Sequence, residues 1–180
     1  AGEMLTGSVK AAILLNTEPA CDAAAGAKGL EQADMVITLS PFKANLDISD
    51  VLLPVAPFTE TSGTFVNAEG RVQSFHAVVK PLGDTRPAWK VLRVLANLLE
   101  LPGFDYESSQ DVLTAAIGAE TKEVPSALRS NITKVAAKVP ENEAAEPVTA
   151  SIYQLDGIVR RATSLQLTAD ARLAREGGAA

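Results

Sequence analysis

Six polar or charged side chains stand where they could line a ligand pocket. Two of them follow an apolar run at residues 11–15, and the other four lie between residues 60 and 71. Carboxylates and amides exchange hydrogen bonds with polar ligands, and an arginine fork binds carboxylate or phosphate groups. The set therefore suits a polar organic ligand. The candidates are Asn16, Glu18, Glu60, Asn67, Glu69 and Arg71.

The same side chains can instead hold a loop together. Asn67, Glu69 and Arg71 surround a turn at Glu69-Gly70 and can satisfy each other and nearby backbone groups. Gly63 and Gly70 are interpreted as turn positions that need a permissive backbone. Ligand binding and loop support are both open on this pattern alone.

Soft-metal chemistry is excluded within this chain by its counts. It has one cysteine, Cys21, and one histidine, His76, too few for a disulfide, a zinc site or an iron–sulfur site. Neither residue has a nucleophile or base partner at a recognisable spacing, so no catalytic residue and no metal ligand is predicted. We interpret Cys21 as a small buried residue and His76 as a surface or strand residue.

The charge balance removes other classes of function. The 180 residues carry a formal net charge of −6, which argues against a nucleic-acid-binding surface. No run of 18 apolar residues occurs, so no direct membrane insertion is expected.

Three short apolar runs, at 11–15, 34–39 and 50–54, predict strands buried on both faces. An alanine-rich stretch between the first two, Ala20 to Leu30, predicts a short helix. The alternation predicts an α/β fold, with a short and mostly parallel sheet and flanking helices. In such sheets ligands bind at the carboxyl ends of the strands, which is where Asn16 and Glu18 stand.

A different pattern follows. Residues 64–67 and 72–79 are predicted to be extended, a helix is expected to begin at Pro87, and Ser108 is expected to cap another. We expect one α/β domain at 1–139, an acidic linker at 140–150 and a helical C-terminal docking tail at 151–180. The start of the chain, Ala1-Gly2-Glu3, is interpreted as a cut end of a longer protein.

The tail carries its own pattern. Ile152, Leu155 and Val159 share a helical face, and Asp156 with Arg160 form a favourable i,i+4 pair. The arginines at 160 and 161 either pair with an acidic surface of a neighbouring subunit or form an ordinary solvated charge pair. Such a tail must dock on the domain or on a partner.

One long spaced motif resembles a known family. Asp50 to Pro54, followed by Glu60-x-x-Gly-Thr-x-x-Asn-x-Glu-Gly-Arg-x-Gln73, is similar to a segment of the molybdopterin oxidoreductase superfamily. The run Thr59 to Gln73 most resembles the G-subunit family of bacterial NADH:quinone oxidoreductase (respiratory complex I). The tail at Ile152–Ala162 and at Leu165-Gln166 resembles the C-terminal extension of that subunit.

The resemblance implies a scaffold segment that supports electron transfer from NADH to quinone and catalyses nothing itself. It implies no cofactor in this fragment, a vestigial pocket at the six candidates, and iron–sulfur clusters in a missing N-terminal part of the parent. The implied partners are other peripheral-arm subunits of complex I. The implied location is the cytoplasmic face of the bacterial inner membrane, as a peripheral part of a membrane complex.

Two alternatives remain. One is a cofactor-binding fragment of a molybdopterin-dependent oxidoreductase such as a formate-dehydrogenase-like enzyme, where Asn16, Glu18, Glu60 and Asn67 would touch a pterin-nucleotide. The superfamily's enzymes typically place a carboxylate near the position that Ser40 holds here, which counts against this alternative. The other is a stand-alone module for a nucleotide-like ligand.

Overall fold

The computed structural model describes residues 5, 7–23, 26–118 and 151–177. The chain divides into two compact units. The sheet unit comprises residues within 1–53 and 143–180, and the hairpin unit comprises residues within 54–142. The predicted acidic linker at 140–150, and the stretch 119–139 before it, lie outside the described residues.

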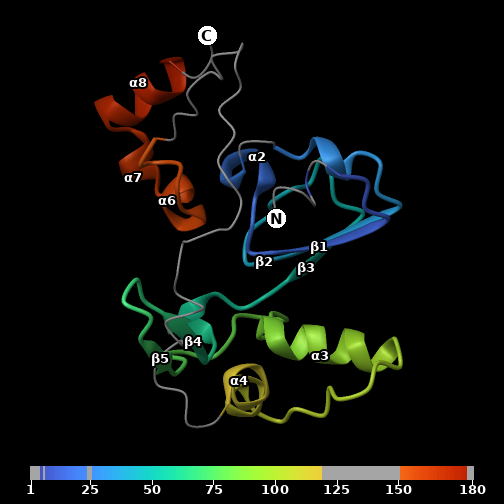
Figure 1. Ribbon diagram of the computed structural model, residues 1–180. Helices are drawn as coiled ribbons and strands as arrows, with labels where there is room; N and C mark the ends of the chain where they lie inside the picture. Colours follow the sequence, from blue (N-terminus) through green and yellow to red (C-terminus); the bar gives the residue numbers. More distant parts are fainter. Residues whose placement is uncertain (1–4, 6, 24–25, 119–150, 178–180) are drawn as a thin grey trace, which may run out of the picture. The chain divides into compact units, whose positions relative to one another are not determined.

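The sheet unit is built on three strands in the order β1-β2-β3 (Figure 1). These are β1 (Ala11–Leu15), β2 (Met35–Ser40) and β3 (Val51–Pro54). Strands β1 and β2 run parallel, in register from Ala11 opposite Met35 to Leu15 opposite Leu39. The three strands predicted from apolar runs, and the α/β class with a short parallel sheet, are confirmed. The predicted burial on both faces holds for β2 but is wrong for β1 and β3, most of whose residues are exposed on at least one face.

The central strand β2 carries the core. Val36 and Leu39 are almost completely buried, as expected for a strand with a neighbour on each side. Val36 packs in a cluster with Leu14 and Leu30. Partly buried side chains surround that cluster: Leu5, Val9, Ala12, Ala33 and Ile48.

A polar seam fixes the loop that connects β2 to β3. The Thr38 side chain is fully buried, and its hydroxyl lies 2.6 Å from the hydroxyl of Ser49. The backbone N–H of Val36 donates to an Asp50 carboxylate oxygen at 2.7 Å, and the N–H of Asp50 donates to the Val36 carbonyl at 2.9 Å. Because buried polar groups are costly unless they are hydrogen-bonded, these contacts set the path of the loop.

The single helix predicted for Ala20 to Leu30 is wrong. Its place is taken by a one-turn helix, α2 (Pro19–Asp22), and a short 3₁₀ helix, η1 (Lys28–Leu30). Gly26 has φ +61°, a left-handed conformation that an α-helix cannot contain. The interpretation of Cys21 as buried is also wrong, because its side chain is exposed on α2.

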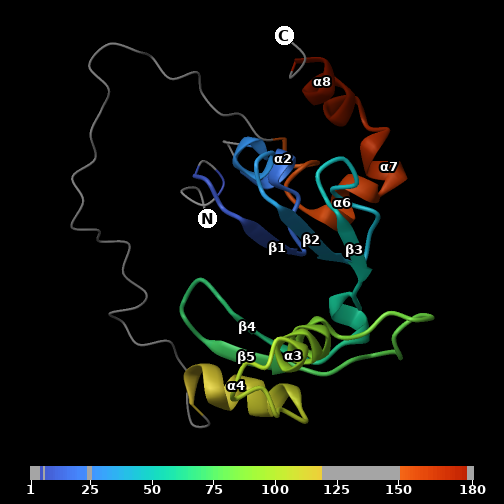
Figure 2. The ribbon, with the colours of Figure 1, turned by 90° about the vertical axis from the view of Figure 1, so that its right-hand side faces the viewer.

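The hairpin unit follows β3 (Figure 2). A 3₁₀ helix, η2 (Phe58–Glu60), precedes the antiparallel pair β4 (Gly63–Val66) and β5 (Val72–Phe75). The extended stretch predicted for 72–79 therefore ends as a strand at Phe75. Val55 is fully buried and forms a parallel bridge with Arg86. Two helices follow Arg86 in the chain, α3 (Ala88–Leu98) and α4 (Ser109–Ile117).

The two glycines of the hairpin have different roles. Gly70 lies in the turn between the strands with φ +83°, which confirms the prediction of a permissive backbone. Gly63 lies inside β4 instead, so its interpretation as a turn residue is wrong. A Cβ atom at Gly63 would come within 2.8 Å of the Phe75 ring, so glycine is needed for close approach.

Helix starts follow the predicted signals. The Ser108 hydroxyl accepts a hydrogen bond from the Asp111 N–H, and the Asp111 carboxylate accepts one from the Ser108 N–H. These reciprocal bonds form a capping box, which confirms the predicted cap. Pro87 is the N-cap of α3, one position before the helical residue it was predicted to be.

Three short helices form the C-terminal part of the sheet unit: α6 (Gly157–Arg161), α7 (Thr163–Gln166) and α8 (Ala169–Gly177). The buried Gln166 side chain of α7 joins this helix to α6 and to the turn before it by donating to the carbonyls of Tyr153, at 2.9 Å, and Val159, at 2.8 Å. The predicted helical face begins too early, since α6 starts only at Gly157 and Ile152 is exposed. Among the described residues, none of the helices has the length and apolarity that a bilayer span requires.

Candidate functional site

The carboxyl ends of β1 and β2 form the edge where the sequence analysis places Asn16 and Glu18. Asn16 directly follows β1 with φ +50°, and its N–H donates to the Leu39 carbonyl of β2 at 2.9 Å. Asparagine tolerates this left-handed conformation better than most residues. The bend that it makes carries the chain from β1 into α2, where Glu18 is the N-cap.

Two carboxylates meet at this edge. Asp22, at the end of α2, turns back and accepts from the Glu18 N–H at 2.7 Å and from the Thr17 hydroxyl at 3.2 Å. Glu18 is therefore held in place through its backbone, while its own side chain is left to bind another group. The result is an acidic pair on one turn of helix.

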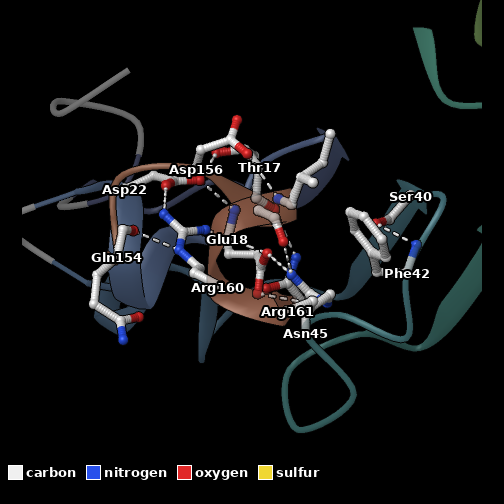
Figure 3. A network of polar contacts seen from close by, with 12 residues as sticks. Thr17, Glu18, Asp22, Ser40, Phe42, Asn45, Gln154, Asp156, Arg160 and Arg161 are labelled. Atoms are coloured by element: carbon white, nitrogen blue, oxygen red, sulfur yellow. Dashed lines mark hydrogen bonds and ion pairs between the residues drawn. The ribbon is translucent and has the colours of Figure 1, made fainter. Parts of the chain in front are cut away.

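Arg161 of α6 binds the first carboxylate (Figure 3). Its two terminal nitrogens donate to the two oxygens of Glu18, at 2.8 and 3.1 Å, in a bidentate pair. The guanidinium carbon also lies over the Phe42 ring, 4.3 Å from the ring centre. Because Glu18 follows β1 and Phe42 follows β2, this one side chain spans the ends of both strands.

Arg160 binds the second carboxylate and is the more deeply buried of the two arginines, with 8% of its side chain exposed. It donates to Asp22, to Glu18 at 3.2 Å and, through Nε, to the Gln154 carbonyl at 2.6 Å. The predicted pairing of Asp156 with Arg160 is not what the structure has. Asp156 instead caps α6 by accepting from the N–H groups of Ile158 and Val159.

The remaining polar groups of the edge bind the chain itself. The Ser40 hydroxyl accepts from the Phe42 N–H at 3.1 Å. The Asn45 amide donates to the Thr17 carbonyl at 2.9 Å and to the Thr38 hydroxyl at 3.3 Å. These bonds tie the segment after β2 to the segment after β1, and they complete the edge without a third carboxylate.

The ion pairs extend to lower pH the range in which both acids are anionic. The hydrogen bond from Arg161 lowers the pKa of Glu18 from its ordinary 4.5, against an opposing effect of burial. Burial alone would raise the pKa of Asp22, but the hydrogen bonds from Arg160 and from the Glu18 backbone bring it below 3.8. Both groups are anionic at neutral pH.

Acidification should release the tail from this edge. Because both folded-state pKa values are lowered, the stabilisation is complete above the ordinary values of 4.5 and 3.8 and is lost as pH falls through the lowered ones. An NMR titration of the Arg160 and Arg161 side-chain N–H signals should show them unchanged down to pH 4.5 and shifting only below it. Movement of these signals near neutral pH would contradict the assignment.

The other candidate residues lie in the hairpin unit. Glu60 accepts from the Leu82 N–H at 2.9 Å and so fastens the loop that follows β5. The Asn67 side chain accepts from the N–H groups of Glu69, at 3.0 Å, and Arg71, at 2.9 Å. Asn67 thus organises the turn through backbone groups, as the loop-support interpretation expects.

The structure therefore groups the six candidates by unit. Asn16 and Glu18 belong to the strand edge of the sheet unit, and the four from Glu60 to Arg71 belong to the hairpin unit. Sequence reasoning missed Asp22, which accepts from the Glu18 N–H, and Phe42, whose ring lies against Arg161. It named the arginine pair but assigned it to a neighbouring subunit or to solvent. The spacing of charged residues along the sequence gives no signal that Arg161 pairs with Glu18, which lies 143 positions away.

Comparison with known proteins agrees with this architecture. The molybdopterin oxidoreductase family model matches residues 2–98, slightly more than half of the chain. A provisionally named formate dehydrogenase of Staphylococcus aureus strain USA300 is 38% identical over 77 residues, which are 42% of this chain and 8% of the relative. Its counterpart in strain MRSA252 is 33% identical over 84 residues, 46% of this chain and again 8% of the relative.

The match thus spans less than a tenth of the length of these curated relatives. Within this chain, however, the family model covers the sheet, its carboxyl edge, the hairpin and all of α3. The chain belongs to the molybdopterin oxidoreductase family.

Proposed function

We propose that this chain is a segment of a larger molybdopterin-family oxidoreductase and that it contributes structure rather than a reacting group. The observation that supports the proposal is that an arginine of the same chain is already bound at the strand edge. Glu18, the carboxylate best placed to receive a ligand, accepts a bidentate pair from Arg161 of the same chain. A reacting or ligand-binding group would have to give up that pair first.

We infer that the edge, as folded, disfavours the pterin-nucleotide that the family's enzymes hold, because its two carboxylates are already paired with arginines. Such a ligand needs acceptors for its base and donors for its phosphates. Here the Glu18 carboxylate is paired, the Ser40 hydroxyl accepts from the backbone, and the Asn45 amide donates to Thr17. Among the described residues no cluster of three or more metal-ligating His, Cys, Asp or Glu side chains occurs either. No reaction step is therefore assigned to this segment.

The names of the relatives favour a parent that resembles formate dehydrogenase. In such a parent, molybdenum or tungsten chemistry would take place on residues outside this chain. The segment would then support the fold around that centre. This parent agrees with the comparisons better than the complex I assignment does.

A second candidate parent is the G subunit of bacterial NADH:quinone oxidoreductase. The docked tail supports it, because the tail lies outside the family match and has the residues that resemble that subunit's extension. Its partners would be other peripheral-arm subunits. Its place would be the cytoplasmic face of the inner membrane, with iron–sulfur clusters elsewhere in the parent.

Metal content and activity of the intact parent distinguish the two. Near-stoichiometric molybdenum or tungsten, together with formate-dependent dye reduction, is expected for the first candidate. Iron without either metal, together with NADH-dependent quinone reduction in a complex, would establish the second. Substituting Glu18→Gln in that parent tests the structural role separately: turnover should change less than twofold, and a loss of two orders of magnitude at unchanged protein yield would refute it.

A further inference from the structure

The C-terminal segment is attached to the sheet unit mainly through charge. We call residues 151–167, which include α6 and α7, the tail strap. Its helices have only five and four residues, too short to be stable alone. Several of its apolar side chains are more than half exposed: Ile152, Leu155 and Leu167. These three side chains therefore contribute little buried apolar surface, and the two arginines supply the specific attachment.

The strap is also seated by shape. Gly157, the first residue of α6, faces the edge closely. A Cβ atom there would lie 3.4 Å from a Glu18 carboxylate oxygen and 3.7 Å from the Phe42 ring. A Cβ atom alone would therefore make ordinary van der Waals contact with the edge. A side chain that branches beyond Cβ, such as valine, would crowd the edge without altering any charge.

From these contacts we propose that the tail strap is a releasable cover of the strand edge. Arg161 pairs with the Glu18 carboxylate after β1 and lies over the Phe42 ring after β2. Arg160 donates to both carboxylates of the acidic pair. The cover lies at the place where parallel α/β sheets accept ligands, so the strap and any ligand or partner at this edge exclude each other. Opening requires that the ion pairs and the Arg161–Phe42 contact break, while the apolar core stays intact.

The proposal goes beyond the proposed function, because it holds for either parent. Ion pairs that are partly exposed weaken as salt screens them, with a Debye length of about 3 Å at 1 M salt. Hydrophobic packing does not weaken in this way. High salt should therefore free the strap selectively, and the unmodified chain can be used to test it.

Hydrogen exchange measured by mass spectrometry tests the proposal on the full chain. Exchange of peptides within 151–167 should be at least tenfold faster in Glu18→Gln and in Arg161→Gln, and also in the unmodified chain at about 1 M salt. Peptides from β1 and β2 should keep their protection. The double variant should exchange no faster than the faster single variant, because the two side chains are partners.

Two further variants make the result decisive. Gly157→Val should accelerate exchange of the same peptides through shape alone, whereas Arg172→Gln, on an exposed position of α8, should change nothing. The proposal is overturned if the strap's exchange is insensitive to both salt and Glu18→Gln. It is equally overturned if β1 and β2 lose protection together with the strap, since the contact would then be part of the core fold.

Discussion

Replacing Leu39 with alanine should lower the free energy of unfolding of the sheet unit by about 3 kcal/mol. Leu39 is 1% exposed and lies near the end of the central strand, so truncation removes buried apolar surface and leaves a cavity. Urea unfolding followed by the NMR signals of β1 and β2 measures the change. The midpoint should fall while the dependence on urea concentration stays the same.

A matched control is Leu15, which faces Leu39 in the β1–β2 register but is 41% exposed. Leu15→Ala makes the same chemical change on the neighbouring strand and should cost less than about 1 kcal/mol. If both variants lowered the free energy of unfolding equally, the different burial of Leu39 and Leu15 would not determine how much each contributes to stability.

Replacing Arg160 with methionine should weaken docking of the tail strap by about 2 kcal/mol. The side chain is 8% exposed and binds three acceptors, so its loss leaves the Gln154 carbonyl and two carboxylates without this donor. Partial exposure of Glu18 and Asp22 keeps the cost below that of a fully buried pair. Methionine retains much of the apolar stem, so the variant isolates the charged group.

Limited proteolysis measures this loss, because cleavage within 151–167 follows the population of the released strap. A change of about 2 kcal/mol corresponds to roughly 30-fold faster cleavage. The Arg172→Met variant supplies the control at an exposed arginine. A cleavage rate unchanged by Arg160→Met would mean that the strap is held by contacts other than its ion pairs.

The parts of this structure that were predictable are those encoded in neighbouring residues. The strands at 11–15 and 34–39 were readable because each consists almost entirely of consecutive apolar residues between turn signals. Ser108 was readable as a cap because the capping box lies within four residues. Local chemistry and tertiary structure agree at these places, so the pattern alone is sufficient.

The failures have two physical origins. The alanine-rich stretch after Pro19 has good helix propensity, yet Ala23 is already extended and Gly26 is left-handed, so the helix ends after one turn. The partners of the two arginines were not predicted for another reason, because Arg160 and Asp22 are 138 positions apart. Local spacing offered Asp156 as a partner, but in the structure Asp156 caps its own helix. Ion pairs between distant segments leave no periodic signal.

That separation has a consequence for the order of events during synthesis. A ribosome adding about 5 to 20 residues per second needs roughly 7 to 30 seconds to travel from Asp22 to Arg160. The parallel pairing of β1 with β2 needs only residues up to position 40 and can form well before then. Each newly made chain therefore passes through an interval in which its acidic pair is exposed to the cell, and an assembly factor or neighbouring chain with a basic surface would have first access to it.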